Sequence, residues 1–244
     1  MQYLRSLLYT ILFFAVTLLF GFAVLIAAVL PLSLEQRYVI PRTWGLFLTW
    51  LAGAICGLHY VVEGRENLPD RPFISLWKHS SSWDTLAQMF VVPPASWLLK
   101  REVTWIPVVG WAVKTYKPIA INRSAGHSAV NQVIAQGRER LAAGMGIIVY
   151  PEGTRVAAGQ TRKYGISGAL LGTQTGAPVV PIAHNSGYFW GRRSILKSPG
   201  TIRVVIGPPI DPLGLDPREI NARAQQWIEG KIAEIVAQPG GKPD

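Results

Sequence analysis

A histidine and an aspartate follow a short apolar run in the first half of the chain. Residues 73–77 are predicted to form a buried strand, and this strand leads directly into the polar segment KHSSSWD, residues 78–84. His79 and Asp84 stand five positions apart, a spacing that a loop-to-helix turn can close. A carboxylate that accepts one N–H of an imidazole fixes its tautomer and stabilises the imidazolium, so the pair predicts a general base. A histidine with a purely structural role is the alternative interpretation of this pair alone.

A second polar cluster ends a later apolar run. Residues 147–150 are predicted to form a buried strand that continues into Pro151 and the segment EGTR, residues 152–155. Gly153 lets the backbone approach a ligand, Thr154 offers a hydroxyl, and Arg155 carries a planar fork suited to phosphate. A plain strand-ending turn is the alternative. Two strands that each end in such a cluster favour one site at an edge of the sheet.

The sequence motifs of serine hydrolases and of metal sites are absent. The pentapeptide Gly-x-Ser-x-Gly of a serine nucleophile elbow does not occur, and GISG at residues 165–168 is one glycine out of place. The four histidines show no paired ligand spacing, and His-Glu-x-x-His is absent. Cys56 is the single cysteine, which excludes an intrachain disulfide and a thiolate cluster. We therefore expect no metal.

Strand-like and helix-like segments alternate after residue 57. The expected strands lie at 58–62, 73–77, 97–99, 118–121, 147–150, 179–182 and 202–206. The expected helices lie at 84–90, 126–143, 165–175 and 217–236. This alternation predicts an α/β domain over residues 58–244, in which a mixed sheet is flanked by helices.

The first 57 residues are strongly apolar. Residues 7–30 contain no charged side chain, and a span of about 20 such residues crosses a bilayer. The stretch is too long for a signal-peptide core. A second apolar stretch at 44–56 is shorter, and its alternatives are a second span, an interfacial helix or a re-entrant segment. We assign residues 1–57 to a membrane-anchoring segment of one or two helices.

The charge is concentrated outside this segment. The formal net charge is +10, of which residues 1–60 contribute +2 and the remainder +8. A basic domain beside an apolar anchor fits anionic lipid headgroups or phosphate-bearing substrates. Nucleic acid is the rival partner for a basic surface, but it gives the anchor no role, so we expect none. The basic flanks favour a cytoplasmic position for the domain.

The polar clusters together resemble the glycerolipid acyltransferase family, specifically the 1-acyl-glycerol-3-phosphate acyltransferases. The family motif His-x4-Asp is matched by His79 and Asp84, and Glu-Gly-Thr-Arg by residues 152–155, about seventy positions later. IAINR at 119–123 and APVVPI at 177–182 match two further motifs, although Asn122 stands where the family often has Asp. The resemblance covers roughly residues 58–210.

This resemblance implies an enzyme that transfers a fatty acyl group from acyl-CoA or acyl carrier protein to the sn-2 hydroxyl of 1-acyl-glycerol-3-phosphate, giving phosphatidic acid. His79 would be the base, oriented by Asp84, and Lys100 would stabilise the oxyanion. The expected acceptor-binding residues are Arg123, Glu152, Gly153 through its amide, Thr154 and Arg155. No cofactor is implied beyond the acyl donor.

The resemblance also implies a location and leaves alternatives. We expect the bacterial inner membrane, with membrane lipids as partners and the catalytic domain on the cytoplasmic side. One alternative is an acyltransferase for another lysophospholipid or a lyso-aminolipid. The other is a catalytically silent membrane protein that binds lipid. For Lys100 and Arg123, a solvated surface charge is the alternative role.

Overall fold

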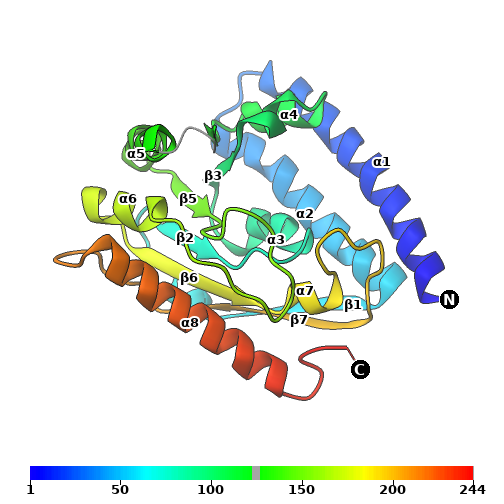
Figure 1. Ribbon diagram of the computed structural model, residues 1–244. Helices are drawn as coiled ribbons and strands as arrows, with labels where there is room; N and C mark the ends of the chain where they lie inside the picture. Colours follow the sequence, from blue (N-terminus) through cyan, green and yellow to red (C-terminus); the bar gives the residue numbers. More distant parts are fainter. Residues whose placement is uncertain (123–126, 244) are drawn as a thin grey trace.

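The chain folds as an α/β structure preceded by two long apolar helices (Figure 1). The structure, a computed structural model, describes residues 1–122 and 127–243. Its helices are α1 (Gln2–Ala28), α2 (Leu34–Cys56), α3 (Trp83–Val91), α4 (Val109–Lys114), α5 (His127–Ala142), α6 (Ser167–Thr175), α7 (Ser186–Phe189) and α8 (Pro217–Ala237), with 3₁₀ helices at Arg65–Asn67 and Arg101–Trp105. Its strands are β1 (Leu58–Glu63), β2 (Ile74–Trp77), β3 (Ala95–Lys100), β4 (Ile119–Ile121), β5 (Gly146–Val149), β6 (Val179–His184) and β7 (Gly200–Ile206).

The strands form a mixed sheet. In the described part of the chain, seven strands lie in the order β1-β7-β6-β2-β5-β3-β4. Strands β6 and β7 are antiparallel, whereas the other neighbouring pairs are parallel. Strands β2 and β6 are buried along their whole length, as expected for strands with both faces covered. The predicted α/β fold with a mixed sheet is confirmed.

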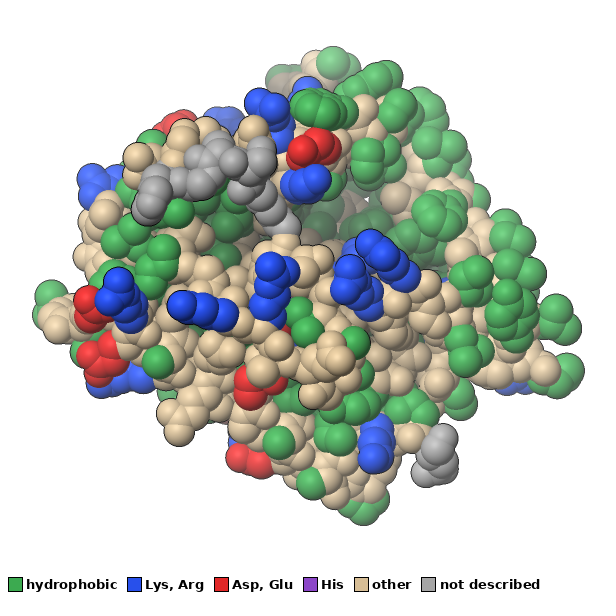
Figure 2. Space-filling model, viewed as in Figure 1, with side chains coloured by type: hydrophobic (Ala, Val, Ile, Leu, Met, Phe, Trp, Pro, Cys, Tyr) green, Lys and Arg blue, Asp and Glu red, His purple; other side chains and the backbone are tan. Residues whose placement is uncertain are grey.

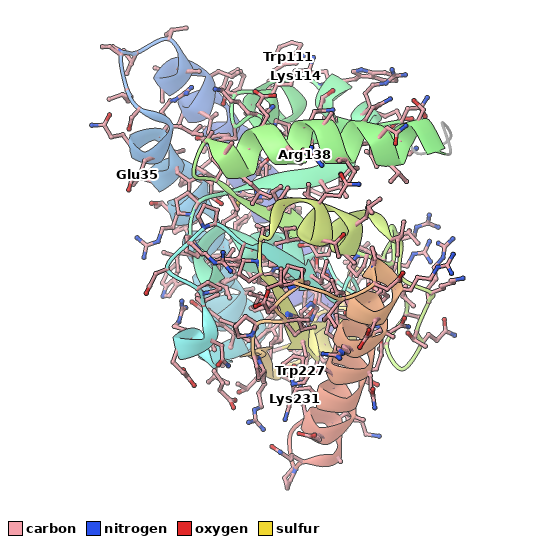
Figure 3. The ribbon with its side chains drawn as sticks, turned by 90° about the vertical axis from the view of Figure 1, so that its left-hand side faces the viewer. Glu35, Trp111, Lys114, Arg138, Trp227 and Lys231 are labelled. Carbon is pink, nitrogen blue, oxygen red and sulfur yellow. The ribbon has the colours of Figure 1, made fainter. Side chains whose placement is uncertain are left out.

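Helices pack on both faces of the sheet. Helices α5, α6 and α8 lie side by side on one face (Figure 3, with Arg138 on α5 and Trp227 and Lys231 on α8), and α2 and α3 lie on the other. Successive side chains of a strand point to opposite faces. Accordingly, Ile74 and Leu76 of β2 join the core under α6 and α8, while Trp77 joins the core under α2 and α3.

The two N-terminal helices are long and apolar enough to cross a membrane, judged by length and composition. Large apolar side chains of α1 are exposed along its length, including Leu8, Phe14, Leu19 and Ile26. Figure 2 shows apolar side chains along the outer edge of the molecule that α1 forms in Figure 1. A membrane is the environment that suits such a surface.

The second helix is longer than the sequence pattern predicted. It begins at Leu34 rather than near residue 44, because Ser33 and Gln36 form a reciprocal capping box at its start. Pro41 lies inside it and cannot donate to the carbonyl of Arg37. The hydroxyl of Tyr116 donates to that carbonyl instead, at 2.9 Å.

The elements predicted after residue 57 are all present, with ends shifted by a few residues. The short helices α4 and α7 were not predicted. A helix of four to six residues spans fewer than two turns, so it shows too little periodicity to be recognised.

Candidate active site

His79 and Asp84 meet at the junction between β2 and α3. The Nδ1 atom of His79 lies 3.1 Å from Oδ1 and 3.2 Å from Oδ2 of Asp84. The Asp84 carboxylate is fully buried, and its Oδ2 also accepts from the backbone N–H groups of Ser80 (3.0 Å) and Ser81 (2.9 Å). The hydroxyl of Ser81 accepts from the N–H of Trp83, the first residue of α3. The turn therefore holds the carboxylate against the imidazole.

The charge state of Asp84 follows from these contacts. Burial alone would raise the pKa of its carboxyl, but the His79 imidazole and the donated N–H groups lower the pKa below its usual value. An ionised carboxylate only accepts hydrogen bonds, so the proton of a neutral His79 sits on Nδ1. The Nε2 lone pair is then the basic position of the ring.

Tyr150 supports the imidazole ring from one side. The two rings are stacked, with centroids 4.0 Å apart and planes 27° apart. The Tyr150 hydroxyl donates to Oε1 of Gln88 at 3.0 Å, and burial raises the pKa of this phenol well above its usual value. Tyr150 therefore stays neutral and restricts how the ring can turn. The one sequence signal for Tyr150 is its position directly before the segment Pro151-Glu152.

The Glu152 carboxylate contacts the segment that carries Lys78 and His79. Its Oε2 accepts from the backbone N–H of His79 at 2.7 Å, and its Oε1 lies 2.8 Å from Nζ of Lys78. Only 3% of Glu152 is exposed. Burial raises the pKa of this carboxyl, and Lys78 offsets part of that rise. The structure thus places Glu152 behind His79, as a link between the two polar clusters.

The loop after Glu152 is tied to the same place by its backbone. The N–H of Val156 donates to the carbonyl of His79 at 2.8 Å. Gly153 turns the chain at φ +70°, and its N–H donates to the carbonyl of Tyr150 at 3.0 Å. The Gly153 N–H, for which we predicted a contact with phosphate, is thus used within the turn. Thr154 and Arg155 are partly exposed beside it.

The other predicted basic residues lie farther along the sheet edge. Lys100 ends β3, which is next to β5, and its ammonium lies 3.5 Å from the Glu102 carboxylate in an exposed pair. Arg123 lies outside the described residues. Strands β2, β5 and β3 are parallel neighbours, so the loops carrying His79, Glu152 and Lys100 all leave the sheet at the same edge.

A second histidine, which sequence reasoning did not place in the site, fixes the backbone beside His79. Nε2 of His184 lies 2.8 Å from the carbonyl of Lys78, and its Nδ1 lies 2.9 Å from the hydroxyl of Ser186. Burial lowers the pKa of His184, so it is neutral, donates to Lys78 and accepts from Ser186. Its burial and its neutral charge make it a support for the loop.

An apolar cavity of about 100 Å³ lies between the N-terminal helices and the domain. Its lining includes Phe20 and Gly21 of α1, Trp44 of α2, Met89 of α3 and Trp97 of β3. Because almost all of the lining is apolar, the cavity suits hydrocarbon.

Comparisons with known proteins agree with this architecture. Residues 59–185 match a family model described as Acyltransferase. A 1-acyl-sn-glycerol-3-phosphate acyltransferase of Pseudomonas aeruginosa is 40% identical over 96% of this chain and 92% of its own length. A lyso-ornithine lipid O-acyltransferase of the same organism is 27% identical over 80% of this chain and 83% of its own length.

A solved structure shows the same fold. The crystal structure of the 1-acyl-sn-glycerophosphate (LPA) acyltransferase PlsC from Thermotoga maritima aligns with a TM-score of 0.81 at 24% identity. The alignment covers 98% of this chain and 99% of that protein, so the two N-terminal helices are included in the likeness.

Proposed function

Because the chain belongs to the acyltransferase family, we propose that it transfers a fatty acyl group from a thioester donor to the sn-2 hydroxyl of 1-acyl-glycerol-3-phosphate. The observation that carries this proposal is the contact between His79 and a buried, ionised Asp84, beside the loop that holds Arg155. The name of the 40% identical relative supports the choice of acceptor.

The proposed reaction needs one base and no covalent enzyme intermediate. Nε2 of His79 accepts the proton of the acceptor hydroxyl while the oxygen attacks the thioester carbonyl. The tetrahedral oxyanion collapses, the C–S bond breaks, and the imidazolium returns its proton to the leaving thiolate. Asp84 stabilises that imidazolium. General-base catalysis of this kind contributes about 10²–10⁴-fold, and alignment of the two substrates contributes more.

Basic residues are proposed to bind the oxyanion and the phosphate of the acceptor. Lys100 is the proposed oxyanion donor, since its exposed pair with Glu102 is weak and easily exchanged. Arg155, with the Thr154 hydroxyl and Arg123, is proposed to bind the acceptor phosphate, because a guanidinium can donate two parallel hydrogen bonds to it. Glu152 is proposed to act by holding His79 rather than by touching glycerol.

The membrane supplies one substrate and the aqueous phase the other. The apolar cavity beside α1 and α2 is proposed to take acyl-chain carbons, and the two helices are proposed to hold the enzyme in the bacterial inner membrane. The donor, acyl-CoA or acyl carrier protein, is soluble, so we propose a catalytic domain on the cytoplasmic side.

The His79→Ala variant tests the proposed function. We expect the initial rate of transfer to lysophosphatidate in vesicles to fall by about 10³-fold, within the range for a lost general base. Membrane attachment and the melting temperature should stay close to wild type. The matched control is His59→Ala, since His59 is exposed on β1. Near-normal transfer by purified His79→Ala would remove His79 as the base.

The Arg155→Ala variant tests the acceptor site. The apparent KM for lysophosphatidate should rise about tenfold, as for loss of a charge-assisted contact, while kcat at saturation changes less. Arg162→Ala, which removes an exposed arginine from the same loop, is the control. An unchanged KM in Arg155→Ala would take Arg155 out of the phosphate site.

A lyso-aminolipid acceptor is the second candidate function. The observation that favours it is the 27% identical lyso-ornithine lipid O-acyltransferase, which matches over most of both chains. The higher identity to the relative named for a phosphate-bearing acceptor favours lysophosphatidate.

A further inference from the structure

The residue directly before His79 is a buried lysine. Lys78 is only 3% exposed, although lysine side chains are rarely buried without partners. Its Nζ lies 2.8 Å from Oε1 of Glu152, 2.7 Å from Oε1 of Glu229 on α8, and 2.9 Å from the carbonyl of Gln160. One ammonium therefore joins the end of β2 to two distant segments of the chain, the loop between β5 and α6 and helix α8.

The contacts continue from this lysine to the base. The Glu152 oxygen that does not contact Lys78 accepts from the backbone N–H of His79 at 2.7 Å. We infer that Lys78 and Glu229 are positioning residues, because the chain of contacts Glu229–Lys78–Glu152 ties α8 to the backbone of His79. This inference rests on the proposed function, in which His79 is the base.

The charges explain why the lysine is needed. Two carboxylates converge on Lys78, and Glu152 is almost fully buried. Without the ammonium, the Glu152 carboxylate would be desolvated and unpaired, and it would take up a proton more readily. A neutral Glu152 accepts more weakly from the His79 N–H, so the loop that sets the imidazole would loosen.

Glu229 brings the C-terminal helix into the active site. Its Oε1 also accepts from the Thr161 hydroxyl at 2.9 Å, so it holds the segment that follows Arg155. Helix α8 crosses the sheet on the face opposite α2 and α3 (Figure 1). Glu229 lies beyond residues 59–185, the segment matched by the family model. The structure thus gives this helix a part in positioning the base as well as in covering the core.

The backbone at Lys78 is held independently of its side chain. Its N–H donates to the carbonyl of Ile182 at 3.2 Å, and its carbonyl accepts from His184 at 2.8 Å. Strand β2 should therefore remain in the sheet when the lysine side chain is replaced. What changes is the anchoring of Glu152.

The test compares Lys78→Met and Glu229→Gln with Glu234→Gln. Glu234 lies on the same helix in an exposed pair with Lys231, which makes it a matched control. We expect kcat to fall by about 10–100-fold in Lys78→Met and severalfold in Glu229→Gln, with KM for the acceptor within about threefold of wild type, because small misplacements of a base are costly. The double variant should equal Lys78→Met alone, since both residues act through one contact.

Two further readouts separate positioning from a general loss of folding. The acid limb of the kcat profile should move to higher pH in Lys78→Met. Hydrogen exchange of the peptide covering residues 78–84 should be faster in both variants and unchanged in Glu234→Gln. An unchanged acid limb together with kcat losses that only follow the folded fraction would overturn the inference.

A failure of this inference can be distinguished from a failure of the proposed function. The wild-type rate with lysophosphatidate tests the function, whereas hydrogen exchange at 78–84 reports on the contacts whether or not that lipid is the acceptor. If Lys78→Met does not fold, Glu229→Gln with wild-type exchange and wild-type kcat would still overturn the inference.

Discussion

Two buried lysines of the domain have opposite surroundings. Lys78, beside His79, the proposed base, contacts the carboxylates of Glu152 and Glu229. Lys197, in the loop before β7, is 1% exposed and contacts the carbonyl of Ser6 at 3.3 Å and the hydroxyl of Thr10 at 2.5 Å. Among the described residues it has no ion-pair partner.

Aromatic rings take the place of carboxylates around Lys197. Its Nζ lies 4.9 Å from the ring centroid of Tyr9 and 4.7 Å from that of Trp190. Burial lowers the pKa of Lys197 to about 8. A buried ammonium can thus either link carboxylates from distant segments, as Lys78 does, or hold an apolar helix against the domain, as Lys197 does.

Asp84→Asn, a change near Lys78, should have the largest effect, which is on kcat. The amide keeps the shape but removes the charge that stabilises the imidazolium, so kcat should fall by about 10²–10⁴-fold. Initial rates of acyl transfer measure this. Asp216→Asn, at the exposed N-cap of α8, is the control, since asparagine caps a helix as well as aspartate. A small effect of Asp84→Asn would contradict the proposal that the Asp84 charge stabilises the imidazolium.

Replacing Lys78 by methionine should lower the free energy of unfolding much more than the same replacement of Lys197. Lys78→Met leaves two carboxylates without their cation, and we expect the free energy of unfolding to fall by about 3–5 kcal/mol. Lys197→Met removes a charge that has no counterion, so its effect should stay within about 1 kcal/mol, with kcat unchanged. Denaturant titrations in detergent measure both. Equal losses would contradict the contrast between the two sites.

Alkaline pH should have the smallest effect on stability. This effect arises at Lys197, where the lysine packs against α1. The folded pKa of Lys197 is about 8, and the unfolded value is about 10.4. Between these values the folded state binds fewer protons than the unfolded state, so stability rises as pH rises through this window. From pH 7.5 to 9.5 wild type should gain about 2 kcal/mol relative to Lys197→Met. A gain of the same size in Lys197→Met would assign it to another group.

Local patterns were enough to predict the contact between His79 and Asp84. His79 and Asp84 are five residues apart, so one turn brings them together, and the alternation of strands and helices places the loop carrying Glu152 beside them. The contacts that Glu152 makes could not be predicted from its position in the motif. Its carboxylate is bonded by His79 and Lys78, which no spacing in the sequence revealed.

Contacts between distant segments could not be predicted. Glu229 is 151 positions from Lys78, and Thr10 is 187 positions from Lys197, so each pair depends on how α8 and α1 pack. A proline inside a helix leaves one carbonyl without its usual donor, and only the tertiary contact from Tyr116 shows how Pro41 is tolerated.

The central claim is that this enzyme acylates lysophosphatidate. The most direct test is a panel of acceptors, each offered to the purified wild-type protein in vesicles with acyl-CoA and with acyl carrier protein as donors. We expect phosphatidic acid as the product. The kcat/KM for lysophosphatidate should be at least tenfold above that for lysophospholipids with larger headgroups and for lyso-ornithine lipid, a preference of about 1.4 kcal/mol. Higher kcat/KM for one of those lipids, or no transfer to lysophosphatidate from either donor, would contradict it.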